Sequence, residues 1–272
     1  MATEDFRPVM PQFAPGRRIE VDPYSVTATP LQMTFQSQVI SSGTAFFWRR
    51  NNRTYLITNW HNVSGKNPRT GVHLSPTAAE PNSLSFDVFE GGDINRRRAA
   101  IGQIRDAQGK PLWLEHPVHR KRVDVVALEL GSLNPKWVYP INELAVGSIR
   151  AQIGGDAFIL GFPMGVGPSR MAIWKRASIA TEPDIDVENL PLMYVDTATS
   201  AGMSGSPVII RSTLGERDDG SRVMMLGPMT RFIGIYSGRL QPDGAVGAQL
   251  GFIWKAPVID EIIDGQQLGS TE

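Results

Sequence analysis

A serine flanked by glycines is the clearest chemical feature of the sequence. Ser204 stands in the window GMSGSP (202–207), directly ahead of the strand-like run PVII. A serine that attacks a carbonyl group needs backbone N–H groups aimed at the developing oxyanion, and glycine allows the tight turn that presents them. Gly-Ser turns between strands are also common without any activity, so this window requires partners elsewhere in the chain. It predicts Ser204 as a nucleophile, with the N–H groups of Gly202 and Ser204 as oxyanion donors.

Two upstream windows supply the partners that a serine nucleophile requires. His61 follows the strand-like run YLITNW, and Asp124 precedes the apolar run VVALEL. Taken singly, His61 also fits a turn or core histidine, and Asp124 also fits a solvent-facing carboxylate at the start of a strand. Together, the chain order His61, Asp124, Ser204 is one in which a base, its orienting carboxylate and a nucleophile are known to occur. The three windows therefore predict a catalytic triad.

The same residues exclude one large class of hydrolases. The α/β-hydrolases carry the pattern G-x-S-x-G and place their histidine after the serine. All four histidines of this chain, at positions 61, 73, 116 and 119, precede Ser204, and residue 206 is serine. The α/β-hydrolase interpretation is therefore ruled out.

The sequence offers little that would hold a metal ion. It contains no cysteine, which excludes thiolate ligands, disulfides and a thiol nucleophile. His116 and His119 flank Pro117, and a proline there disrupts the helical face on which two histidines bind zinc. We therefore predict no metal site and no cofactor.

Composition narrows the range of partners and compartments. The 272 residues carry 27 basic and 27 acidic side chains, so the formal net charge is zero. A neutral chain has no overall attraction for nucleic acid or for anionic lipid. No apolar run approaches the roughly 18–20 residues that span a bilayer, and the acidic N-terminus around Glu4 and Asp5 does not match a signal peptide. We expect a cytoplasmic protein without nucleic-acid or membrane partners; the oligomeric state stays open.

Short β-rich runs broken by turn residues fill the chain from about residue 25. Their spacing of roughly 8–15 residues favours an all-β sandwich or barrel over βαβ units. In FFWRRNNRTYLI two such runs surround a polar turn at Asn51 and Asn52, which is typical of a β-hairpin. The one clear helical pattern is terminal, where Pro257 precedes VIDEIID.

With these motifs the chain resembles the chymotrypsin-fold, or trypsin-like, serine peptidases, and most closely their cysteine-free bacterial Deg-type (high-temperature-requirement) branch. The similarity covers about residues 30–260. Its segments are SGTAFF, ITNWHNV, VDVVALEL, ILGFPMGVG, VDTATSAGMSGSPV and RFIGIYSG. The pattern leaves no room after residue 260 for that branch's PDZ domain, so its chaperone role is not carried over.

The resemblance implies an all-β fold of two antiparallel six-stranded Greek-key barrels with a C-terminal helix. We accordingly expect an extended arm over residues 1–24 and an N-terminal barrel over 25–135 that contains His61 and Asp124. The C-terminal barrel is expected over 136–272, with Ser204 and the terminal helix.

The resemblance also implies the roles of the site residues. His61 acts as general base and then acid, Asp124 orients it, and Ser237 hydrogen-bonds Asp124 from the far side. The residues that correspond to the substrate pocket are Ala198, Thr199, Tyr236, Ser237, Gly238 and Arg239. The base of this pocket carries no carboxylate, so we expect small or medium apolar residues at P1, the residue before the cleaved bond.

One departure from the family bears on activation. Digestive members become active when a freed N-terminal ammonium pairs with an aspartate directly before the nucleophile. Here that position is Met203, which cannot hold an ammonium, so we expect no zymogen step.

The function that the resemblance implies is a serine endopeptidase acting on protein or peptide substrates through an acyl-enzyme. Two alternatives remain from the residues alone. One is a catalytically silent peptide-binding module on the same fold, and the other is an esterase that uses the same triad.

Overall fold

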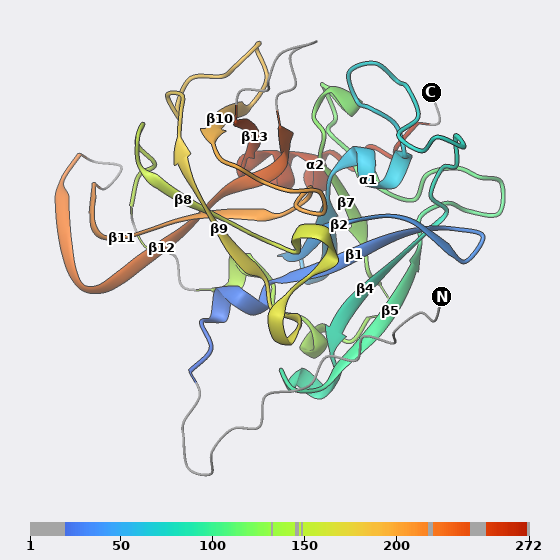
Figure 1. Cartoon of the computed structure of the whole chain (residues 1–272), viewed down its shortest axis with the longest axis horizontal. Helices are drawn as coiled ribbons and strands as arrows, with labels where there is room; N and C mark the ends of the chain where they lie inside the picture. Colours follow the sequence, from blue (N-terminus) through green and yellow to red (C-terminus); the bar gives the residue numbers. More distant parts are fainter. Residues whose placement is uncertain are drawn as a thin grey trace, which may run out of the picture.

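Antiparallel strands form the framework of the fold, with few helices (Figure 1). The computed structural model describes residues 20–131, 133–144, 147, 149–216, 220–239 and 249–270. The strands are β1 (Ala28–Phe35), β2 (Gln38–Arg50), β3 (Arg53–Thr58), β4 (Ser83–Phe89), β5 (Arg97–Gln103), β6 (Leu114–Glu115), β7 (Val126–Glu129), β8 (Asp156–Gly161), β9 (Ile173–Ile179), β10 (Leu192–Asp196), β11 (Pro207–Glu216), β12 (Arg222–Arg239) and β13 (Leu250–Lys255).

Two α-helices accompany the strands, α1 (Trp60–Ser64) and α2 (Pro257–Gly265). Short 3-10 turns cover Pro23–Val26, Glu90–Gly92, Arg120–Arg122, Pro135–Trp137, Ile141–Glu143, Pro163–Gly165 and Pro168–Arg170. The predicted arm over residues 1–24 lies outside the described residues as far as residue 19. No helix in the described ranges is both long and apolar enough to cross a membrane.

The first sheet carries the N-terminal half of the described chain and lies to the right in Figure 1. Its strands follow the order β5-β4-β1-β2-β3-β7-β6, and all its pairings are antiparallel. The predicted hairpin is present: Arg50 pairs with Arg53, and Asn51 and Asn52 adopt φ of 50° and 59°. Positive φ at both turn residues is what a two-residue hairpin of right-handed twist requires, and asparagine tolerates it.

The second sheet closes into a barrel of six strands in the order β10-β13-β12-β11-β8-β9. It lies to the left in Figure 1. Its interior is filled mainly by aliphatic side chains, together with Met193, Met203 and Tyr236.

The all-β class, the two antiparallel sheets and the C-terminal helix are confirmed. The strand count of the first sheet differs from the expected six. It has seven strands because the two-residue strand β6 pairs with β7, and the pairings between its described strands do not close it into a barrel.

The middle of the first sheet is buried on both faces. Residues 43–48 of β2 and 54–58 of β3 are buried without interruption. Phe47 and Leu56 pack in the core of the first sheet, whereas Phe46 and Ile57 pack in a second cluster shared with α2 and the barrel. Strands covered on both sides read as continuous apolar runs, which explains the segments TAFFW and YLIT.

Helix α2 joins the two halves. It buries Val258, Ile259, Ile262 and Ile263 at the spacing of one helix face. The Ala256 N–H at its start donates to Ile233 O of β12 (3.0 Å). From the first sheet, the indole of Trp48 donates to Asp260 Oδ1 (3.0 Å).

The layer of strands buried on both faces predicts that alanine substitutions at two leucines differ greatly in their effect on the free energy of unfolding. Leu56→Ala removes a side chain that is 0% exposed and should lower the free energy of unfolding by about 2–5 kcal/mol. The matched change Leu74→Ala, at a side chain that is 54% exposed, should cost less than about 0.5 kcal/mol. Urea unfolding of the two variants measures this, and equal losses would contradict the assigned core.

Candidate active site

His61 lies on α1, directly after strand β3. Asn59, the residue before the helix, is fully buried and donates from Nδ2 to the backbone carbonyl of Asp124 (2.7 Å). Gly65 ends the helix in the left-handed region (φ 71°), and its N–H donates to His61 O (3.0 Å). The helix is therefore fixed at both ends, one of them by the segment that carries Asp124.

The side chains of His61 and Asp124 form a close pair. His61 donates its backbone N–H to Asp124 Oδ1 (2.9 Å), and its Nδ1 lies 2.7 Å from Asp124 Oδ2. Ser237 of β12 donates its hydroxyl to the same Oδ2, as expected from the resemblance. The carboxylate is 4% exposed and the imidazole 16%. With Nδ1 protonated toward the carboxylate, the lone pair is on Nε2, which is the tautomer a general base requires.

Ser204 sits in a tight loop that joins β10 to β11. Gly202 and Gly205 on either side have φ of 91° and 87°, values that favour glycine. The Gly205 N–H donates to Tyr236 O (2.9 Å). The Ser204 hydroxyl donates to Ser237 O (3.0 Å), and no hydrogen bond joins it to His61 among the described residues. The structure thus brings the three predicted residues to one junction, with the serine hydroxyl turned toward β12.

The N–H groups of Gly202 and Ser204 have no hydrogen-bond acceptor in the described part of the chain. Between them the Met203 N–H donates to Ser200 O (3.4 Å), and Met203 itself is 1% exposed in the barrel core. Two backbone donors without an internal acceptor, beside a serine hydroxyl, are suited to binding an oxyanion.

Thr44 of β2 holds this loop in place from the first sheet. Its hydroxyl donates to Gly202 O (2.8 Å) and accepts from the Phe162 N–H (3.1 Å), and its backbone N–H donates to Ser204 O (2.8 Å). The carbonyl groups of the loop are therefore bound on the side of β2. Sequence reasoning missed this role, although Thr44 lies in the quoted segment SGTAFF.

Asn62 is a second residue that sequence reasoning missed. Its Nδ2 donates to Ser204 O (3.3 Å) and to Thr58 Oγ1 (2.9 Å). Gly43 permits this approach, because a β-carbon there would lie 2.9 Å from Asn62 Nδ2 and 3.2 Å from Ser204 O. The available signal was the asparagine directly after the histidine in the quoted segment ITNWHNV.

The residues predicted for the substrate pocket lie on two adjacent segments. Ala198 and Arg239 are exposed, whereas Thr199 and Tyr236 are buried and hydrogen-bonded to each other through their hydroxyls. Burial raises the pKa of the Tyr236 phenol, and the Thr199 hydrogen bond opposes that rise. None of the six residues predicted for the pocket is acidic, and the buried carboxylate that Ser237 contacts is that of Asp124.

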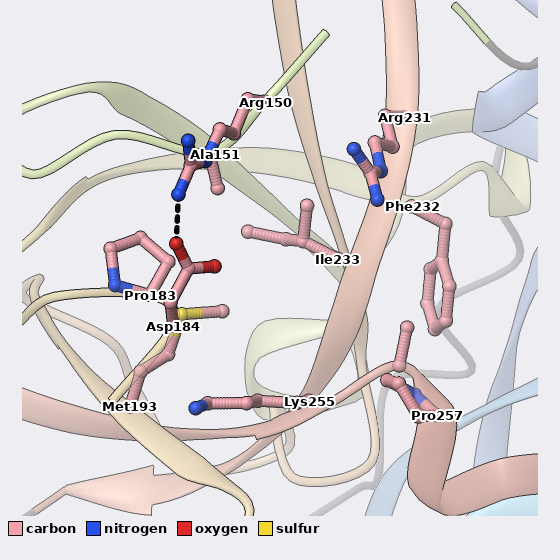
Figure 2. Close-up of a pocket in the computed structure, with 11 residues that line it drawn as sticks. Arg150, Ala151, Pro183, Asp184, Met193, Arg231, Phe232, Ile233, Lys255 and Pro257 are labelled. Atoms are coloured by element: carbon pink, nitrogen blue, oxygen red, sulfur yellow. Dashed lines mark hydrogen bonds and ion pairs between the residues drawn. The ribbon is translucent and has the colours of Figure 1, made fainter. Parts of the chain in front are cut away.

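A pocket of about 210 Å³ lies on the barrel (Figure 2). Its lining includes Ile233, Lys255 and the ion pair between Arg150 and Asp184, and none of the predicted site residues contributes to it. The pocket therefore does not define the site.

No cluster of three or more metal-ligating side chains is found in the described residues. His116 has a structural environment instead: its Nδ1 accepts the N–H groups of Val118 (3.2 Å) and His119 (3.0 Å). Its Nε2 lies 2.8 Å from Glu261 Oε2 of α2. Burial lowers the pKa of this imidazole, which favours the neutral form with its proton on Nε2.

Comparison with known proteins places these residues in a family. The model of the trypsin-like peptidase domain matches residues 43–213, a range that includes His61, Asp124 and Ser204. No curated protein sequence matches the chain.

The chain is also similar to solved structures at low sequence identity. One is an inactive serine-to-alanine mutant of Rv3671c from M. tuberculosis H37Rv: 15% identity, 89% of this chain, 86% of that chain and a TM-score of 0.48. Another is the serine endoprotease from Yersinia pestis: 11% identity, 91% of this chain, 67% of that chain and a TM-score of 0.47. A third is an inactive form of the Rv3671c protease: 16% identity, 89% of each chain and a TM-score of 0.44.

The loop around Ser204 predicts a strong requirement for glycine at position 205. A β-carbon there would collide with Thr44 O in addition to the unfavourable φ of 87°. Gly71 has a φ of 72° but no atom near its would-be β-carbon. Gly71→Ala should therefore cost about 1 kcal/mol, and Gly205→Ala at least about 2 kcal/mol more. Thermal unfolding compares them, and equal losses would show that the contact with Thr44 is not tight.

Proposed function

The chain belongs to the trypsin-like peptidase family, and on that premise we propose that it is a serine endopeptidase with the triad His61, Asp124 and Ser204. The observation that carries the proposal is the pair between His61 Nδ1 and Asp124 Oδ2 at 2.7 Å, with Ser204 at the same junction. The His-Asp pair lies on segments next to strands of the first sheet, and the serine lies in a loop between two strands of the barrel. We retain the predicted division into residues 25–135 and 136–272 on this ground.

The proposed reaction begins with rotation of the Ser204 hydroxyl from Ser237 O toward His61 Nε2. Ser204 Oγ then attacks the carbonyl carbon of the substrate, and its proton passes to Nε2. His61 next donates that proton to the leaving nitrogen as the C–N bond breaks, which leaves an acyl ester on Ser204. Water attacks the ester with His61 again as base, and the carboxylic product and the free serine are released.

The rest of the loop supports the charged states of this reaction. The N–H groups of Gly202 and Ser204 are the proposed donors to the tetrahedral oxyanion. Asp124 stabilises the imidazolium form of His61, and Ser237 supplies a further donor to the Asp124 carboxylate. No proposed step requires a metal or a cofactor.

A peptidase acting on protein or peptide substrates is proposed ahead of the two alternatives, a catalytically silent binding module and an esterase. A silent binding module has no physical need for a buried carboxylate paired with a histidine beside a serine. An esterase would share the mechanism and differ in its substrate. A fluorophosphonate probe separates active from silent forms because it labels only an activated serine, with loss of fluoride. Comparison of matched peptide and ester substrates then separates peptidase from esterase.

We expect two substitutions to test the triad. Ser204→Ala should abolish peptide hydrolysis and probe labelling with the fold unchanged, because the nucleophilic oxygen is lost. Asp124→Asn should lower kcat on the order of 10⁴-fold, because an asparagine there favours the wrong histidine tautomer. Full turnover by Ser204→Ala on a cleaved peptide would refute the assignment.

The proposed pocket predicts the P1 preference. Ala198 and Thr199 at its base carry no charge, so a buried Lys or Arg side chain would lack a counter-charge. In a peptide library, small or medium apolar P1 residues should be cleaved with a kcat/KM at least about tenfold above that for Lys or Arg. Preferential cleavage after Lys or Arg would show that the pocket has been misplaced.

A further inference from the structure

Glu115 is a buried carboxylate that the proposed reaction does not use, and it contacts α1, the helix that carries His61. Glu115 is 1% exposed, and its strand β6 is one edge of the first sheet. A buried carboxylate is costly unless donors compensate its charge, so the groups around it indicate what it holds together.

Glu115 receives donors from three parts of the chain. Its Oε1 accepts the indole N–H of Trp60 (2.9 Å), the indole N–H of Trp113 (3.2 Å) and the backbone N–H of Ser270 (3.4 Å). Arg120 forms an ion pair with Oε2 at 3.4 Å. Hydrogen bonds to a charged acceptor are stronger than neutral ones, so Oε1 is a firm anchor for all three donors.

The segment after α2 completes this cluster through an antiparallel β-bridge to β6. Leu268 bridges to Leu114, Glu115 N donates to Gln267 O (2.8 Å), and Gly269 N donates to Trp113 O (2.9 Å). The segment approaches the Trp113 ring closely: a β-carbon on Gly269 would lie 2.5 Å from the indole nitrogen.

The cluster borders both members of the His-Asp pair. Trp60 is the first residue of α1 and directly precedes His61. On the other side, Glu115 is the strand partner of Val126, two residues after Asp124. Glu115 therefore contacts the helix that carries the base through its side chain, and it pairs through its backbone with the strand that follows the orienting acid.

We propose that Glu115 is a positioning residue that acts through Trp60 to hold His61 against Asp124. Residues 267–270 belong to the same cluster of contacts around Glu115. The inference rests on the proposed function. Trp60 and His61 share a peptide bond, so an indole held at Oε1 restricts rotation of α1 about its axis. A small displacement of a catalytic base lowers the rate of the chemical step far more than it lowers substrate binding.

Two indole–carboxylate bonds in this protein allow a matched test. Trp60→Phe removes the donor to Glu115 and keeps a buried ring. Trp48→Phe removes an equivalent bond, from Trp48 Nε1 to Asp260 Oδ1 at 3.0 Å, between β2 and α2. Both indoles are buried, with Trp60 3% and Trp48 8% exposed. Both variants should fold, and melting curves verify this.

For peptide cleavage we expect Trp60→Phe to lower kcat about tenfold with KM within twofold of wild type. Trp48→Phe should stay within twofold on both constants. Glu115→Ala should lower kcat by a similar factor, and the double variant Trp60→Phe/Glu115→Ala should be no worse than the poorer single variant. Residues acting through one bond couple in this way, whereas independent effects would multiply.

A second readout needs no substrate. The Nδ1 proton of His61, in its bond to Asp124, gives a low-field proton NMR signal that the His61→Gln variant assigns by its loss. We expect this signal to broaden or shift in Trp60→Phe and to match wild type in Trp48→Phe. If Trp60→Phe behaves like Trp48→Phe in both readouts, the positioning role is refuted. If wild type fails to react with a fluorophosphonate, the proposed function fails, and the NMR comparison still decides the positioning role.

Discussion

The Asp124 carboxylate imposes the constraint on which the site depends. It is almost fully buried, and a buried charge is tolerated only where hydrogen-bond donors surround it. Those donors are the backbone N–H and the imidazole of His61 and the hydroxyl of Ser237. Since His61 lies on α1 of the first half and Ser237 on β12 of the barrel, the charge is compensated only when both halves are in place. The geometry of the proposed triad is in this sense a consequence of satisfying one buried acid.

Ser237 connects this charge to Ser204, the proposed nucleophile. Its hydroxyl donates to Asp124, and its carbonyl accepts from the Ser204 hydroxyl. One residue of β12 therefore contacts two members of the proposed triad. The proposed reaction requires the serine hydroxyl to exchange the Ser237 carbonyl for His61 by rotation about one side-chain bond. The loop around the serine is held by Thr44 and by the barrel.

The doubly buried strands β2 and β3 explain why the loop is so well held. Their middle residues pack against the first core on one face and against α2 and the barrel on the other. Thr44 belongs to that layer, so its hydroxyl is delivered to Gly202 O by the same packing that stabilises the fold. The cluster at Glu115 likewise combines core packing with hydrogen bonding, on the other side of α1, where buried indoles and a carboxylate border the histidine.

The sequence by itself determined the fold class, the Asn51–Asn52 hairpin, the terminal helix and the three candidate residues. Each of these predictions depends on a local pattern, because turn residues, apolar runs and short motifs are all properties of short segments. Only the tertiary structure decided what lies around them. The seventh strand β6 is too short to have a pattern. Thr44 and Asn62 lie 142 to 160 positions from the carbonyl groups that they hold in the loop around Ser204. Glu115 lies 55 positions from Trp60 of α1 and 155 positions from Ser270 of the C-terminal segment. Their partners are set by how two sheets pack, and a buried polar side chain reveals its role only when the groups that satisfy it are in view.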